Sequence, residues 1–94
     1  MHITACTLDV GIPGSRSLKE KRGRILSLLA KVKTRFGLAA AEIGRQNSRD
    51  TAVLAFVAVS TDPAHNDRVL QSALRWMERN RPDLEIRDSH IEPR

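Results

Sequence analysis

Hydrophobic residues follow two different periods along the chain, and the switches between these periods divide the chain into six segments. Residues 3–10 alternate between apolar and polar or small side chains, which predicts a half-buried strand. Residues 51–60 form a valine-rich, nearly continuous apolar run, which predicts a central strand. Two further segments also predict strands, one at residues 38–44 and an edge strand at residues 84–92.

The first helix is predicted between the strands at residues 3–10 and 38–44. Ser17 followed by Glu20 has the spacing of a capping box, so we expect the helix to begin near Leu18. Apolar residues then recur at positions 18, 25, 29, 32 and 36, a stripe with the 3.6-residue period of a helix that buries one face. The stripe stops at Gly37, so the helix is expected to end near Phe36.

A second helix is predicted after the central strand. Asp62 followed by Pro63 is typical of an N-cap with proline at the first helical position, and the helix is expected to end near Asn80. The order is then strand, helix, strand, strand, helix, strand. This order favours a ferredoxin-like α+β fold (βαββαβ), in which two helices cover one face of a four-stranded antiparallel sheet. We expect a single domain over residues 1–94.

Charge is distributed unevenly over this framework. The formal net charge is +5, but residues 1–47 contain nine Lys and Arg against three acids, whereas residues 48–94 contain seven Arg against eight acids. The excess lies within residues 16–35, where eight basic residues accompany one acid. Such a segment indicates either an acidic partner, most plausibly nucleic acid, or a helix whose basic face is simply solvated.

The basic side chains of the first helix and of the loop before it form the predicted binding site. At 100° per residue, Lys21, Arg24, Lys31 and Arg35 are expected on one flank as a stripe about 20 Å long, with Lys19, Arg22 and Lys33 on the other. The hydroxyls and free amides around Arg16 at the helix start offer an anion site, unless Ser17 is used only for capping. The predicted nucleic-acid or anion-binding residues are Ser15, Arg16, Ser17, Lys19, Lys21, Arg22, Arg24, Lys31 and Arg35.

Several other chemistries do not fit the sequence. The run GIPGSRSLK lacks the Gly-Lys-Ser/Thr of a P-loop, and its G-x-x-G follows a strand, whereas that of a KH domain joins two helices. Phe56 is the only aromatic residue on the central strands, so RRM-type stacking is not expected. No acid–base constellation stands out, and we expect neither catalysis nor a cofactor.

Metal binding, a disulfide and a membrane anchor are not expected either. His2 and His90 could approach each other at the strand ends, with Glu92 nearby, but terminal histidines are usually unliganded. Cys6 is the only cysteine, which excludes an intramolecular disulfide and fits a reducing compartment. No apolar stretch approaches membrane-spanning length, so we expect a cytoplasmic protein.

Protein contact is the alternative to nucleic-acid binding. We expect the sheet face away from the helices to carry small apolar residues, such as Ala5, Leu54 and Ala58. Such a face suits a protein-interaction or homodimerisation module that does not bind nucleic acid.

The run IPGSRSLKEKRGRILSLLAKVKTRFGLAAAEIG, together with AVLAFVAVSTD, resembles the YlxP-like family of small bacterial proteins of unknown function. The resemblance covers nearly the whole chain and implies a ferredoxin-like fold, a bacterial source and a gene neighbourhood beside translation initiation and ribosome maturation factors. It brings no catalytic residues, and the aromatic residue that members often carry is missing from RQNSRD. Charge and resemblance together predict an RNA- or ribosome-associated protein, with ribosomal RNA or a ribosomal particle as partner.

Overall fold

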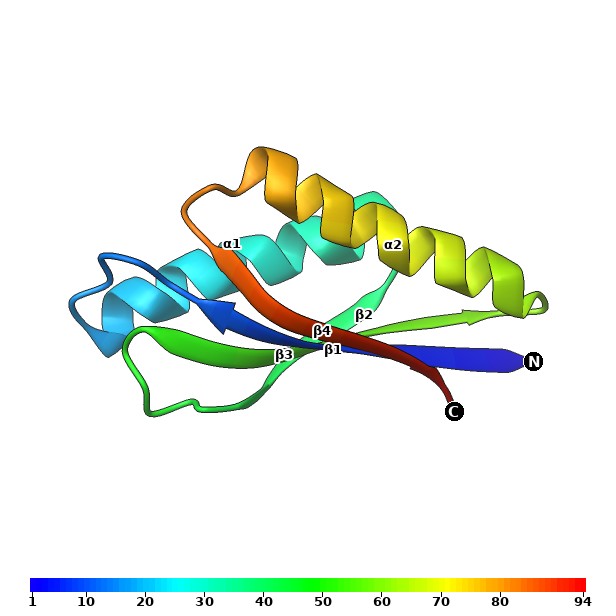
Figure 1. Cartoon of the computed structure of the whole chain (residues 1–94), viewed down its shortest axis with the longest axis horizontal. Helices are drawn as coiled ribbons and strands as arrows, with labels where there is room; N and C mark the ends of the chain where they lie inside the picture. Colours follow the sequence, from blue (N-terminus) through cyan, green and yellow to red (C-terminus); the bar gives the residue numbers. More distant parts are fainter.

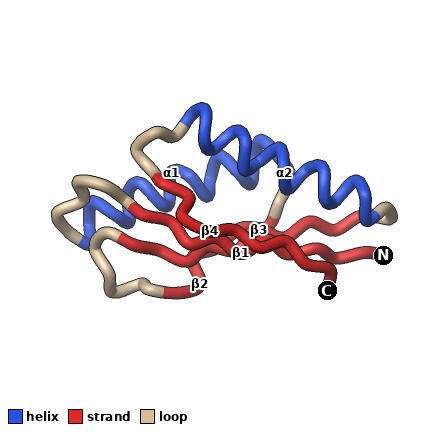
Figure 2. Tube along the Cα trace, in the orientation of Figure 1, coloured by secondary structure: helices blue, strands red, loops and turns tan.

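The six predicted segments form in the predicted order. The computed structural model describes residues 1–94, with β1 (His2–Gly11), α1 (Leu18–Phe36), β2 (Ala39–Gly44), β3 (Thr51–Ser60), α2 (Pro63–Asn80) and β4 (Glu85–Pro93). The four strands pair antiparallel in the order β2-β3-β1-β4, so β2 and β4 are the edges. Both helices lie on one side of this sheet (Figures 1 and 2), which confirms the ferredoxin-like α+β fold.

The helices bury one face of the sheet because the central strands alternate. In β3, Ala52, Leu54, Phe56 and Ala58 are at most 5% exposed and belong to the hydrophobic core. The prediction that Leu54 and Ala58 lie on the open face is therefore wrong, because both share the face of Phe56 under the helices. Ala5 does lie on the open face, where it pairs with Val57.

Local side-chain bonds set the start of α1. The Ser17 hydroxyl accepts a hydrogen bond from the Glu20 amide at 3.1 Å, as predicted. The Glu20 carboxylate reaches one residue further back than in a capping box and accepts from the Arg16 amide at 3.1 Å. At the other end, Gly37 adopts φ 66°, the left-handed conformation that glycine tolerates best.

The second helix is attached to the sheet by a buried amide. Asp62 caps α2 by accepting from the Ala64 amide at 2.9 Å, and Pro63 follows at the first helical position. Asn66 is fully buried, and its Nδ2 donates to the His2 carbonyl at 3.0 Å. This bond fixes the first turn of α2 against β1. Neither helix is long and apolar enough to span a membrane.

Cys6 lies in the middle of β1 and is fully buried under the helices. Burial disfavours the thiolate and raises the pKa of the Cys6 thiol to about 11. The side chain is therefore a small hydrophobic group of the core at neutral pH and not a nucleophile.

Candidate nucleic-acid interface

Lys21 is not part of the accessible surface, contrary to the sequence prediction. Its side chain is 0% exposed and lies on the buried face of α1 together with Ile25 and Leu28. The ammonium group donates to the Arg45 carbonyl at 2.7 Å and lies 2.9 Å from Glu42 Oε2. A phosphate cannot reach this group while the fold is intact.

The Lys21 ammonium connects α1 to β2 and to the first residue of the turn that follows β2. Its contact with Glu42 Oε2 is an ion pair, and that carboxylate oxygen has no hydrogen-bond partner. Arg45 itself has φ 58°, a left-handed conformation that costs free energy for a residue with a side chain. The bond from Lys21 helps to hold that conformation and with it the β2–β3 turn.

Arg24 is also engaged inside the fold. Its guanidinium donates to Glu20 Oε1 at 2.8 Å and to the Pro13 carbonyl at 2.9 Å. It also approaches the Asp83 carbonyl at 3.5 Å, while Arg81 donates back to the Arg24 carbonyl at 3.2 Å. Arg24 therefore joins α1 to the loop between β1 and α1 and to the loop between α2 and β4. Only about a quarter of its side chain (27%) is exposed.

The serines of the predicted anion loop have partners within the chain. Ser15 is buried, and its hydroxyl donates to the Ser17 carbonyl at 3.3 Å. The Ser17 hydroxyl is occupied by capping the helix. The alternative that this loop only turns the chain and starts α1 accounts for both hydroxyls.

The other predicted basic residues are exposed and lie outside the ion pairs of the structure; these are Arg16, Lys19, Arg22, Lys31 and Arg35. They divide between two flanks of α1. Arg22 faces β2, whereas Arg35 faces α2.

Arg35 belongs to a cluster that the sequence analysis missed. Its guanidinium carbon lies 5.9 Å from the ring centroids of both Phe36 and Trp76, and these rings meet edge to face with centroids 6.0 Å apart. Arg75 and Arg79 of α2 line the same cavity, which has a volume of about 270 Å³. No carboxylate lines this cavity.

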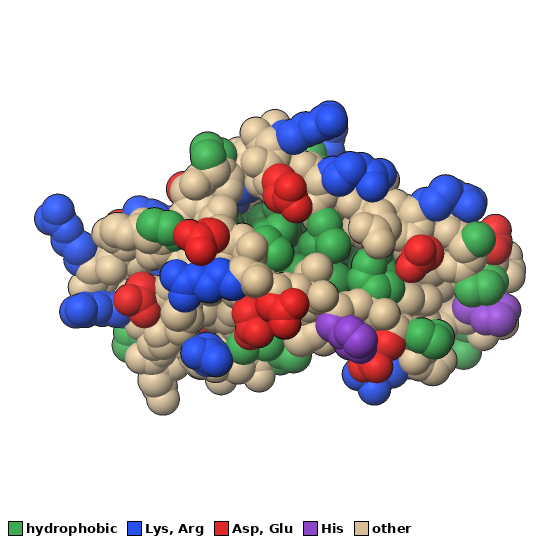
Figure 3. Space-filling view, in the orientation of Figure 1, with side chains coloured by type: hydrophobic (Ala, Val, Ile, Leu, Met, Phe, Trp, Pro, Cys, Tyr) green, Lys and Arg blue, Asp and Glu red, His purple; other side chains and the backbone are tan.

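We call the side chains around this cavity the interhelix cluster: Arg35, Phe36, Ser72, Arg75, Trp76, Arg79 and Asn80. In Figure 3 blue Lys and Arg side chains stand along the upper edge of the molecule, above α2, while charges of both signs mix along β4. The spacing Arg75-x-x-x-Arg79, with Trp76 beside it, was the signal in the sequence. Charge density does not reveal it, because residues 63–80 contain three arginines against two acids, whereas residues 16–35 contain eight basic residues and one acid.

A comparison with known protein families matches residues 3–91 to the family described as "Protein of unknown function (DUF503)". The chain belongs to the DUF503 family. A search of curated proteins gave no match for this DUF503 chain. Among solved structures, the fold is similar to that of "De novo designed protein Foldit4", with a TM-score of 0.54 and 14% sequence identity over 98% of this chain and 96% of the other. At that identity the similarity concerns the fold alone.

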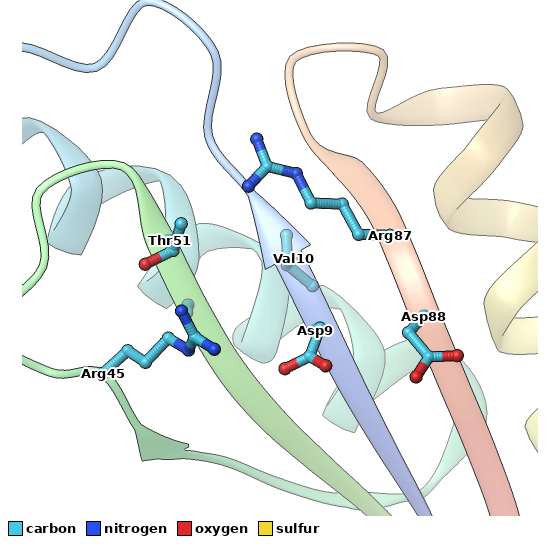
Figure 4. Close-up of a pocket in the computed structure, with 7 residues that line it drawn as sticks. Asp9, Val10, Arg45, Thr51, Arg87 and Asp88 are labelled. Atoms are coloured by element: carbon cyan, nitrogen blue, oxygen red, sulfur yellow. The ribbon is translucent and has the colours of Figure 1, made fainter.

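A second cavity of the DUF503 chain lies on the sheet near the end of β1 and has a volume of about 180 Å³. Figure 4 shows Arg45 reaching across β3 towards Asp9, and Arg87 extending over the end of β1. Asp9 pairs directly with Asp88 in the β1–β4 register. Two arginines and two aspartates balance in charge, so this cavity does not extend the basic surface.

Gly11 gives Arg87 its position above β1. A Cβ atom at Gly11 would lie 2.5 Å from Arg87 Nη2, so any larger residue would displace the guanidinium. His90 Nε2 lies 3.5 Å from Glu92 Oε2 on the neighbouring part of β4. No third metal-binding side chain joins this pair, and His2 is not part of the group.

The open face of the sheet is apolar over the β2 and β3 strands. Val59 and Ile43 are 60% and 55% exposed, and Val53 and Val57 are half-buried between them. An exposed group of apolar side chains of this kind is a candidate surface for protein contact. The DUF503 chain therefore presents two distinct surfaces, a basic one on the helix layer and an apolar one on the opposite face.

Proposed function

We propose that the protein associates with RNA, as a free strand or as part of a ribosomal particle, through the basic surface of its helix layer. The interhelix cluster is the centre of this surface, with Lys31 on the same flank of α1, and Arg16 extends it past the start of the helix. Phosphates bind the guanidinium groups, and an unpaired base stacks on the exposed part of Trp76.

The observation that carries the proposal is a cavity lined by three arginines and two aromatic rings and by no carboxylate, with the Arg35 guanidinium over both rings. Arginine and aromatic side chains together are the usual contacts of proteins that bind single-stranded nucleic acid. The resemblance to the YlxP-like family supports the same proposal, because its genes neighbour those of translation initiation and ribosome maturation factors. Lys21 and Arg24 are not included, since both are engaged inside the fold.

The test is a pair of variants with the same change in charge. Arg75→Glu/Arg79→Glu and Arg22→Glu/Lys33→Glu each lower the net charge from +5 to +1, since each substitution removes two charge units. Affinity for a labelled single-stranded uridine RNA is measured by fluorescence anisotropy over a range of salt. We expect the Arg75/Arg79 variant to bind at least tenfold more weakly, with the salt slope reduced by about 1.4 for two lost phosphate contacts.

The matched variant measures the long-range effect of charge alone, and we expect it to bind more tightly than the Arg75/Arg79 variant. Trp76→Leu, which keeps the charge, is expected to weaken binding without changing the salt slope. Equal affinity of the two charge variants would contradict the proposed site, and wild-type protein that binds neither this RNA nor isolated ribosomal subunits would contradict the function. Co-sedimentation with ribosomal subunits distinguishes the free strand from the particle.

A second candidate function, homodimerisation without RNA binding, is favoured by the exposed apolar open face. A second copy that covers Val53, Val57 and Val59 would bury the apolar stripe of β3 against itself. Sedimentation equilibrium of wild type and of Val57→Glu tests this candidate. A wild-type dimer that the substitution converts to a monomer would support it, and a wild-type monomer at high concentration would contradict it.

A further inference from the structure

The flank of α1 that faces β2 forms a groove that the proposed RNA site does not use. The groove has a volume of about 500 Å³. Its floor is apolar, and Leu26 stands 65% exposed beside it. Its complete lining is Arg22, Ile25, Leu26, Leu29, Lys33, Ala40, Ala41, Glu42 and Gln46.

The open wall of this groove is a strand with a free edge. β2 pairs only with β3, so on its outer side alternate backbone N–H and C=O groups of Ala39–Gly44 have no partner strand. This edge carries no lysine or proline, and its one irregularity is the register shift between Glu42 and Gly44, which leaves Ala39–Glu42 in regular register with β3. An extended segment laid along β2 would satisfy these groups as a fifth strand, the mode of binding known as β-augmentation.

The charge of the groove indicates which kind of segment would bind there. The two basic side chains of the groove, Arg22 and Lys33, lie outside the ion pairs of the structure. The one acid, Glu42, is already paired with the buried Lys21 at 2.9 Å. The groove therefore offers two unmatched positive charges, one towards each end of an apolar floor.

The spacing of these charges fits a strand. Arg22 and Lys33 are separated by eleven positions, which is about 16 Å along a helix at 1.5 Å per residue. Residues four apart in a strand are separated by about 13 Å and point to the same side. Long basic side chains cover the difference, so two acids four positions apart, with an apolar residue midway, would meet Arg22, Leu26 and Lys33 in turn.

We propose that the groove between α1 and β2 binds an extended acidic segment of a partner protein, of the pattern acid-x-apolar-x-acid, which adds as a strand to β2. A second copy of this chain does not suit the groove. Antiparallel pairing of two β2 edges about a two-fold axis perpendicular to the sheet would set Arg22 of one copy near Lys33 of the other, and these side chains carry the same charge. This inference does not depend on RNA binding, because it concerns the opposite flank of α1.

The probe is a synthetic peptide, Ser-Thr-Glu-Thr-Leu-Thr-Glu-Thr-Ser, titrated into the whole protein and followed by NMR. We expect saturable shifts confined to α1 and β2, and slower hydrogen exchange of amides within Ala39–Gly44, which adhesion through charge alone would not produce. The same peptide with both glutamates replaced by lysine is expected not to bind. Leu26→Glu, at an exposed position, is expected to weaken binding at least tenfold.

The two matched charge variants separate this inference from the proposed function. Arg22→Glu/Lys33→Glu is expected to lose peptide binding at least tenfold, whereas Arg75→Glu/Arg79→Glu is expected to retain it within about a factor of two. Equal loss in both variants, or binding without protection of the β2 amides, would overturn the proposal. So would an absence of peptide binding together with greater loss of RNA affinity in the Arg22/Lys33 variant, since the groove would then be an RNA contact.

Discussion

The two halves of α1 contain similar numbers of basic residues but use them differently. The first half contains four basic residues, and two of them are engaged inside the fold. Lys21 is buried against Glu42, and Arg24 is bound to Glu20 and two loop carbonyls, whereas Lys19 and Arg22 are exposed. In the second half, Lys31 and Lys33 are exposed and have no carboxylate partner. The difference lies in the neighbouring elements, because Glu42 and the Asp83 loop approach only the first half. A dense run of basic residues is therefore not itself a binding site.

Removing the acid that pairs with Lys21 is expected to have the largest effect on this contrast. Glu42→Ala leaves a buried ammonium without a counter-charge, and we expect the free energy of unfolding to fall by about 3 kcal/mol. Urea denaturation measures the change. The double variant Lys21→Met/Glu42→Leu is the control, and it is expected to stay within about 1 kcal/mol of wild type because the buried charge is gone. A single variant as stable as wild type would show that Lys21 is solvated after all.

Arg24→Ala is expected to have a smaller effect on stability. The substitution removes hydrogen bonds to the Pro13 carbonyl and the Glu20 carboxylate, and these are worth about 1–2 kcal/mol in total for a partly exposed group. The midpoint of urea unfolding measures the loss. If Arg24→Ala left stability unchanged but weakened RNA binding as much as Arg75→Glu/Arg79→Glu, then Arg24 would be a binding residue, as the sequence first indicated.

A third prediction concerns the effect of low pH on the ion pair between Arg81 and Asp83. Arg81 donates to both carboxylate oxygens of Asp83, at 3.0 and 2.9 Å, and these hydrogen bonds hold the pKa of Asp83 below its usual value of 3.8. Its stabilisation is therefore complete above about pH 4 and is lost as the pH falls through the lowered pKa. We expect wild type to lose more stability than Asp83→Asn between pH 6 and pH 2.5 in urea titrations. Equal losses of stability in wild type and Asp83→Asn would indicate that the ion pair of Arg81 and Asp83 contributes nothing to the free energy of unfolding.

Lys31→Ala, in the second half of α1, is expected to have the smallest effect on stability. The side chain is exposed and outside the ion pairs, so the free energy of unfolding should change by less than about 0.5 kcal/mol. The RNA affinity of this variant should nevertheless fall. Weaker RNA binding without a loss of stability would distinguish Lys31 from the structurally engaged Lys21 and Arg24 of the first half. A loss of stability comparable to that of Arg24→Ala would mean that the second half is also engaged structurally.

Most of the fold was predictable, because each element carries its own local signal. Ser17 and Gly37 mark the ends of α1, Asp62 and Pro63 mark the start of α2, and the boundaries agree with the structure to within about one residue. The face of β3 was assigned wrongly for Leu54 and Ala58. An all-apolar strand has no polar residue to indicate which side meets the helices.

The binding surface was less predictable, because it depends on residues far apart in the chain. Lys21 lies four residues before Ile25, so helical periodicity alone places it on the buried face. The partner of Lys21, Glu42, lies in β2, and no pattern within α1 indicates this pairing. Trp76 and Arg79 join Arg35 only because the two helices lie side by side.

Cys6 allows the opening of the protein core to be measured by thiol labelling. It is the only thiol in the chain, it is fully buried in the core, and its pKa of about 11 keeps it protonated in the folded state. A thiol reagent in neutral solution therefore modifies only molecules that have opened the core, and the labelling rate reports how often that happens. The opening rate of each variant described above can be measured in this way without introducing another cysteine.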